Sequence, residues 1–311
     1  MKNNSIKAVC LILITVLLMT SLTACIRLGS FSQPSVERRT GGDSRESKES
    51  GKSKESKTST ESDTGTDTGK TSANPQKVRF VNYDNGLFRA KIPEGWEVRV
   101  LETSDYIHYT FQIYDPKNPK LCVYFNMKTE GYMSSEEEYN WYTSIYPDTI
   151  FTGIPWLDPA TTEYFFSVFN QAMDVNNTEN FTFPTLSDLK MIESFGTDQM
   201  GAETIRAKAV SADGTNVEGI FYCSIMPFNM YYVTFYNVYS TMFVTAPEGE
   251  LGNWIEVLSK TLGSIEFTDK FTSELNKELT AQGEAAREID QICSDMTEII
   301  NRAWEERTRD W

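Results

Sequence analysis

The sequence VEGIFYCSIM at residues 217–226 and the sequence YYVTFYNVY at residues 231–239 decide the fold of this chain. Both runs are rich in β-branched and aromatic residues, which favour strands. Each run carries apolar residues on both of the faces that a strand presents, as is typical of central strands covered on two sides. We therefore predict two central strands, with a turn at Pro227-Phe228-Asn229.

Shorter strand-like runs extend this pattern toward both ends of the chain. Asp84-Asn85-Gly86 separates two of them and is a strong signal for a hairpin turn. Along residues 106–114, side chains alternate between two faces of a predicted strand. The apolar residues at odd-numbered positions lie on one face, and His108 lies on the other. The predicted strands outside the central pair cover residues 78–83, 87–92, 96–101, 106–114, 121–127, 189–195, 204–212 and 264–267.

Three helices are predicted among these strands, covering residues 135–146, 161–173 and 250–262. The first begins at Ser134 or Ser135, and its first turn carries glutamates, which the dipole at a helix N-terminus favours. Gly263 ends the third helix. Residues 269–311 are also helical by pattern, with a break at Gly283, and their wide apolar stripe favours packing on a domain or in a bundle.

Three short motifs carry a resemblance to a known family: PEGW at 93–96, SSEEEY at 134–139 and GSIEF at 263–267. In this order, with a late antiparallel strand pair, they look like the PsbP/Mog1-like domains, over about residues 77–267. The resemblance implies an α+β fold, an antiparallel β-sheet flanked by helices in an α/β/α sandwich, followed here by a C-terminal helical extension. For function it implies little beyond a protein-binding accessory module.

The first residues have the order of parts found in a secretory signal. A basic start is followed by an apolar run from Ala8 to Met19, which is too short to span a bilayer comfortably. The signal ends in Leu22-Thr23-Ala24-Cys25, which resembles the lipobox of bacterial lipoproteins. The resemblance implies that Cys25 receives a diacylglyceryl group and becomes the first residue of the mature chain. An ordinary secretion signal that happens to end in Cys is the alternative.

A tract rich in Ser, Thr, Gly, Lys and Glu follows the signal. It contains too few apolar residues to offset the entropy of ordering, so we expect it to be disordered, with a reach of roughly 35–40 Å. The predicted division of the chain is a lipoprotein signal peptide at 1–24, lipidated Cys25 with a disordered linker at 25–76, an α+β domain at 77–267 and a helical tail at 268–311.

Charge and cysteine content limit the classes of partner and cofactor. The net charge is −15, and the acidic excess follows residue 76, so nucleic acid and anionic lipid surfaces are poor partners. Cys122, Cys223 and Cys293 fit no metal pattern or disulfide framework, and we expect structural thiols. A bridge between Cys122 and Cys223 stays open as an alternative.

The sequence contains no recognisable catalytic motif. Its single histidine, His108, has no Gly-x-Ser-x-Gly serine to accompany it, and a structural role is expected. We find no His-Glu-x-x-His, Cys-x-x-Cys pair, phosphate-binding loop or dinucleotide fingerprint, and we expect no metal and no cofactor. A pair of catalytic carboxylates would converge in space rather than in sequence, so spacing does not test it.

One loop, Pro147 to Pro159, concentrates apolar residues between prolines: Phe151, Ile154, Trp156 and Leu157. If exposed, these residues would form a partner-binding patch; the alternative is that the loop packs on its own domain. Taken together, the sequence predicts a lipid-anchored protein at the extracytoplasmic face of the cell membrane. We expect a binding or assembly module of the cell envelope, with an envelope protein as the candidate partner. The alternatives are an envelope hydrolase with a carboxylate pair and a small-molecule receptor.

Limited proteolysis tests the predicted linker. Cleavage is expected to concentrate before residue 77 and to leave a resistant fragment, because proteases cut disordered chains first. Mass spectrometry of the fragment gives its boundary. A folded part that loses stability when the linker is removed would contradict the boundary.

Overall fold

The computed structural model describes residues 78–309 except 102, 104, 150, 175–180, 198–201, 231 and 284–288. The predicted signal peptide at 1–24, the lipidation site Cys25 and the linker to residue 76 lie outside the described residues.

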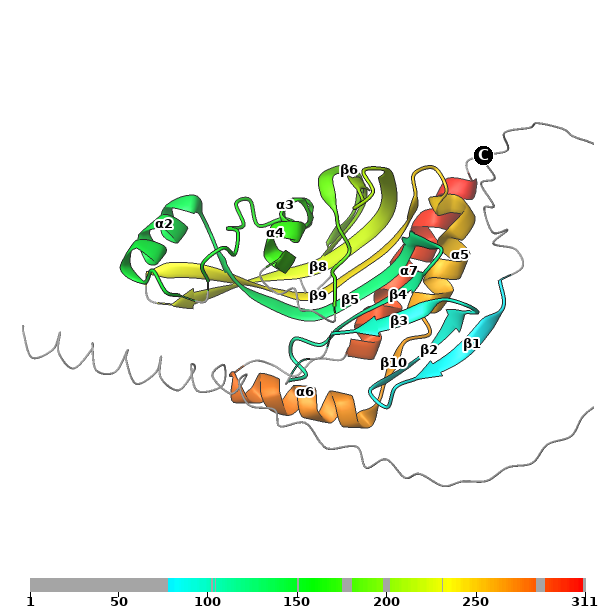
Figure 1. Cartoon of the computed structure of the whole chain (residues 1–311), viewed down its shortest axis with the longest axis horizontal. Coiled ribbons are helices and arrows are strands. Elements are labelled where there is room, and N and C mark those ends of the chain that lie inside the picture. The colour runs from blue at the N-terminus through cyan, green and yellow to red at the C-terminus, as the bar shows by residue number, and fades with distance from the viewer. Residues whose placement is uncertain are drawn as a thin grey trace, which may run out of the picture. The chain divides into compact units, whose positions relative to one another are not determined.

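The two central runs form β8 (Asn216–Met230) and β9 (Val233–Pro247), which pair antiparallel from Val217 opposite Pro247 to Met230 opposite Val233. They belong to a seven-stranded antiparallel sheet in the order β3-β4-β5-β9-β8-β7-β6 (Figure 1). The other strands of this sheet are β3 (Glu97–Val100), β4 (Thr110–Asp115), β5 (Asn118–Met133), β6 (Ser187–Thr197) and β7 (Ala202–Val210).

The predicted turn between the central strands is wrong. Pro227 lies within β8, opposite Tyr236, and the strand continues to Met230. The last pair between β7 and β8 is Ala202 with Ser224, so Pro227 lies where β8 has β9 alone beside it. Proline is tolerated at such an edge because a missing N–H need not remove a ladder hydrogen bond.

The second central strand is also longer than predicted, because β9 does not stop at Tyr239. Ser240 adopts a positive φ of 52°, and the pairing of β8 with β9 shifts register beside it. This irregularity interrupts the alternation of side chains without ending the strand. The sequence pattern therefore suggested an end where the structure has a bulge.

A separate three-stranded sheet consists of β1 (Phe80–Asp84), β2 (Phe88–Pro93) and β10 (Glu266–Phe267), in the order β1-β2-β10. Its hairpin turn is confirmed. Gly86 has a φ of 82°, and the Asn85 side chain accepts hydrogen bonds from the backbone N–H groups of Leu87 and Phe88. Such left-handed geometry is why Asn-Gly sequences form hairpin turns.

Helices cover both faces of the large sheet, which confirms the predicted α+β class. One face carries α5 (Leu251–Leu262), α6 (Asp269–Ala281) and α7 (Ile289–Arg309); the other carries α3 (Thr162–Ser167) and α4 (Phe169–Asp174) (Figure 1). The two buried cores are aromatic. The first includes Phe88, Phe111, Phe125, Trp254, Phe267 and Phe271, and the second includes Tyr124, Phe165, Phe166, Phe169, Phe221 and Phe243.

Two element predictions need correction. The strand predicted at 106–114 begins only at Thr110, since the residues before it form a turn, although Ile107 and Tyr109 are buried in the first core. The helix predicted at 161–173 is interrupted at Val168. Just before the break, the Ser167 hydroxyl donates to the Tyr164 carbonyl, a side-chain bond that competes with helical structure.

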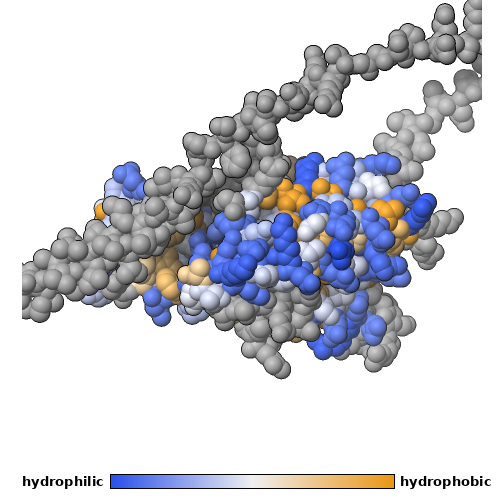
Figure 2. Space-filling model, turned by 90° about the horizontal axis from the view of Figure 1, so that it is seen from below, coloured by the Kyte–Doolittle hydropathy of each residue, from blue (hydrophilic) through white to orange (hydrophobic). Residues whose placement is uncertain are grey.

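The C-terminal tail is helical with its break near Gly283, as predicted, and it completes the first core. Leu275 and Leu279 of α6 are fully buried there, as are Met296 and Ile300 of α7. Seen from below, hydrophilic residues cover most of the coloured surface (Figure 2). Within the described residues, no helix is long and apolar enough to cross a membrane.

The three described cysteines are free and buried, and the alternative of a Cys122–Cys223 bridge is wrong. Cys122 lies opposite Thr245, and Thr245 lies opposite Gly219, four residues along β8 from Cys223. Four residues of strand span about 13 Å, and two strand spacings add about 10 Å sideways. Disulfides need Cα atoms within about 7 Å, so the sheet keeps these thiols apart.

The packing of the tail generates a stability prediction. Met296→Ala is expected to lower the free energy of unfolding by about 2–5 kcal/mol, because it leaves a cavity in the first core. Glu298→Ala, at an exposed position of the same helix, is the matched control and should change it by less than about 0.5 kcal/mol. Urea unfolding measures both, and equal effects would show that α7 is not part of the core.

Candidate functional site

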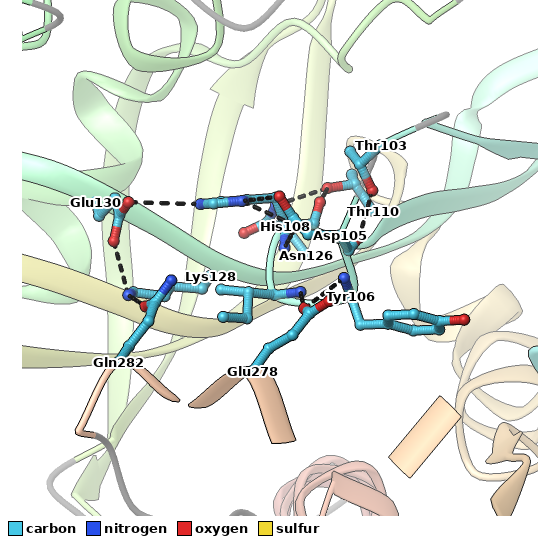
Figure 3. A network of polar contacts seen from close by, with 11 residues as sticks. Thr103, Asp105, Tyr106, His108, Thr110, Asn126, Lys128, Glu130, Glu278 and Gln282 are labelled. Carbon is cyan, nitrogen blue, oxygen red and sulfur yellow. Dashed lines mark hydrogen bonds and ion pairs between the residues drawn. The ribbon is translucent and has the colours of Figure 1, made fainter. Parts of the chain in front are cut away.

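Sequence-distant polar side chains meet where the turn before β4 lies beside β5 and the end of α6 (Figure 3). His108 is at the centre. Its Nδ1 lies 3.0 Å from Asp105 Oδ1, and its Nε2 lies 3.7 Å from Glu130 Oε1. The His108 backbone N–H also donates to Asp105 Oδ1 at 2.9 Å. Both ring nitrogens of the imidazole therefore face carboxylates.

Glu130 also binds a buried lysine. Lys128 Nζ lies 2.7 Å from Glu130 Oε2, and the Lys128 side chain is only 1% exposed. The ammonium donates to Gln282 Oε1 at 3.1 Å and lies 5.6 Å from the centre of the Tyr239 ring. A buried ammonium is costly unless it is paired, and here an anion, an amide oxygen and a ring face surround it.

Glu278 connects α6 to the turn before β4, which also contains His108. Its carboxylate accepts hydrogen bonds from the backbone N–H groups of Tyr106, at 2.7 Å, and Ile107, at 3.2 Å. Phe271, two turns earlier on α6, packs its ring against Tyr106 and Tyr109. The polar network, drawn in Figure 3, and this aromatic contact together attach α6 to the turn before β4.

The ion pairs between His108 and the two carboxylates decide the charge states of these side chains. Burial alone would lower the pKa of His108, but hydrogen bonds and ion pairs with Asp105 and Glu130 raise it to about 9. Burial alone would raise the pKa of Glu130, but His108 and Lys128 lower it to about 2. The pKa of Asp105 is lowered despite burial, again by His108. At neutral pH the imidazole is therefore a cation between two carboxylates.

This arrangement is suited to holding charge. A protonated imidazole with both N–H groups directed at carboxylates has no lone pair to act as a general base. Two ionised carboxylates with lowered pKa values cannot serve as the general acid of a hydrolase. Among the described residues, no hydroxyl or thiol side chain hydrogen-bonds to the His108 ring. We interpret the network as an attachment of α6 and its connecting turn.

The four residues predicted for partner binding lie against their own domain. Phe151 packs on the rings of Tyr142 and Phe235, and Leu157 is 1% exposed. Ile154 is partly buried against the second core, and Trp156 is partly buried beside Tyr139, with ring centres 5.8 Å apart. Phe151 and Trp156 thereby contact α2 (Glu136–Ile145), the predicted helix with Ser135 as its N-cap.

Among the described residues, exposed large apolar side chains lie on β6, at Met191 and Ile192, and at a second place formed by α2 and the end of the β8–β9 hairpin. We call the second place the aromatic tip; it consists of Trp141, Ile145, Tyr146, Phe228 and Tyr232, with exposed fractions of 47%, 49%, 44%, 54% and 87%. Sequence reasoning missed it because it looked for exposure in the loop. The available signal was the spacing of Trp141 and Ile145, which places both on one side of a helix.

Among the described residues, two hollows and the other clusters of titratable side chains are less well defined than the network around His108. A hollow of about 200 Å³ lies between α4 and residues 182–185, smaller than the roughly 300–1,000 Å³ of most ligand pockets. A wider depression along α6 is open to solvent and lined by polar residues such as Asn276 and Lys277. In the part of the chain that the structure describes, no group of three His, Cys, Asp or Glu side chains could hold a metal ion.

No protein-family profile matches the chain, and no curated protein matches it in sequence. Among solved structures, the chain is similar to the solution structure of cyanobacterial PsbP (CyanoP) from Synechocystis sp. PCC 6803. The identity is 12% and the TM-score 0.30, over 61% of this chain and 92% of that chain. At this TM-score and identity, the similarity carries no inference about function or family.

The raised pKa of His108 generates a prediction of pH dependence. His108 contributes most stability below pH 6.5, its ordinary pKa, and that contribution is lost as the pH rises through about 9. The loss of stability in His108→Asn should therefore be largest near pH 6 and smaller near pH 9.5. Urea unfolding of both proteins across this range measures the difference.

The matched control is Asn140→Ala, an uncharged exposed position on α2, whose effect should not vary with pH. A pH-independent effect of His108→Asn would contradict the ion pairing of the imidazole in the folded state.

Proposed function

We propose that this chain is a membrane-tethered lipoprotein at the extracytoplasmic face of the cell membrane, where it acts as a binding or assembly module of the cell envelope. The observation that carries the proposal is Leu22-Thr23-Ala24-Cys25 directly after a basic start and an apolar run. A diacyl anchor at Cys25 would hold the folded part near the bilayer, because two acyl chains give stable anchoring where one does not.

Two features of the folded part support a binding role. The polar network around His108 has charge states and contacts suited to holding α6 and poorly suited to proton transfer. The aromatic tip places five large, exposed apolar side chains on α2, at its C-cap and at the end of the β8–β9 hairpin. Exposed apolar clusters of this kind are typical of interaction surfaces.

The lipid anchor is tested by metabolic labelling. Cells expressing the full chain are grown with labelled palmitate, and incorporation is compared between wild type and Cys25→Ala. Label is expected in the wild type and absent from Cys25→Ala, because the thiol of Cys25 is the acceptor. Cys10→Ala, which removes another cysteine of the signal region, is the matched control and should keep its label. Equal label in wild type and Cys25→Ala would overturn the proposal.

A further inference from the structure

We propose that the aromatic tip is the docking surface of this chain, and that it binds a protein surface with an apolar centre surrounded by Lys and Arg. This inference rests on the proposed binding function. It adds the site at which this chain binds and the chemistry of the partner bound there.

The two segments that carry the tip residues, α2 and the end of the β8–β9 hairpin, are held together by the packing of α2 on the start of β9. The ring of Tyr142 meets the ring of Phe235 edge-on at 5.6 Å, and the backbone N–H of Ser134 donates to the Thr234 carbonyl. Phe228 lies opposite Phe235 in the strand pair, so its side chain is on the same face as α2. Figure 1 shows α2 beside the end of the hairpin.

Hydrogen bonds and ring contacts hold α2, which carries part of the tip, against the hairpin before any partner arrives. Ser135 caps α2 by accepting from the Glu138 backbone N–H, and the Glu138 carboxylate accepts from the Ser134 hydroxyl and the Thr234 backbone N–H. Phe151 packs beneath Tyr142, and Gly153 donates its N–H to the Tyr139 hydroxyl. A rigid aromatic surface loses little conformational entropy on binding, which favours its use as an anchor.

The charges around the tip select the partner. Residues 134–160 and 225–239, which supply α2, its supporting loop and the end of the hairpin, contain no Lys and no Arg. Their charged residues are all acidic, and Glu136, Glu137 and Asp148 are exposed. An apolar centre with an anionic rim matches an apolar surface with a cationic rim.

The same charges disfavour two other occupants. A second copy of the chain would bring two acidic rims together, and like charges across an interface cost several kcal/mol. A bilayer surface with anionic lipids would repel the rim, since such surfaces attract Lys and Arg and not Glu and Asp. A basic protein partner is therefore the occupant that the surface favours.

Peptide selection with the purified full chain tests the proposal. A random peptide library displayed on phage is selected against the full chain, and the affinities of the enriched peptides are measured. The expected peptides combine Lys or Arg with large apolar residues. Trp141→Ala/Phe228→Ala should weaken their binding roughly tenfold or more, because aromatic anchors carry much of the binding free energy at interfaces.

Two further variants separate the apolar from the electrostatic contribution. Glu136→Gln/Glu137→Gln should weaken binding and reduce its dependence on salt, since it removes exposed anions without removing the aromatic residues. Met191→Ala/Ile192→Ala is the matched control: these residues are 41% and 43% exposed on β6, beside Lys190, and their loss should leave binding unchanged. Thermal midpoints close to that of the wild type show that each variant is folded.

Several outcomes would overturn the proposal. These are a failure to enrich peptides, enriched peptides without basic residues, and equal weakening by the β6 control. Partition into phosphatidylcholine or phosphatidylglycerol vesicles that falls with Trp141→Ala/Phe228→Ala would identify a lipid surface instead. Sedimentation that shows self-association through the tip would identify a second copy. Absence of lipid at Cys25 would refute the anchor alone, since peptide binding does not depend on it.

Discussion

The backbone pairing of β8 with β9 is the interaction on which the rest of this structure depends. The two strands form a long ribbon with apolar residues on both faces: Phe221 and Phe243 point into one core, and Ile220 and Val244 point into the other. Since neither face can remain in water, the chain must supply a layer for each. The short helices α3 and α4 form the layer over the second core, and α5, α6 and α7 contribute to the layer over the first core.

Strand β8 extends beyond its neighbour β7, while β5 accompanies β9 as far as Met133 opposite Phe235, and this extension carries the candidate binding surface. Strand β7 accompanies β8 only as far as Ser224, while β8 continues to Met230. The projecting end has its own small core of Met133, Tyr142, Val233 and Phe235, covered by α2. Such a small core cannot enclose all of the aromatic residues around it, so part of their surface faces solvent.

The polar network around His108 explains how α6 keeps its position against the sheet. Apolar packing holds α6 against the sheet without specifying its position along the axis, whereas Glu278 and Gln282 bind particular groups in the turn before β4 and in β5. Buried ionic contacts add little net stability. A different position of α6 along its axis would remove Gln282 from Lys128, and a buried ammonium that loses a partner is costly. We infer that the network selects one position of α6.

Much of the fold followed from the sequence by itself: the central strands, the hairpin at Gly86, the helix after Ser135 and the break near Gly283 were all predicted from local patterns. These features depend on residues close together in the chain. The length of β9, the partners of His108 and the exposure of Trp141 were decided only by the tertiary structure. Each depends on which distant segment lies alongside, and linear spacing does not encode that contact.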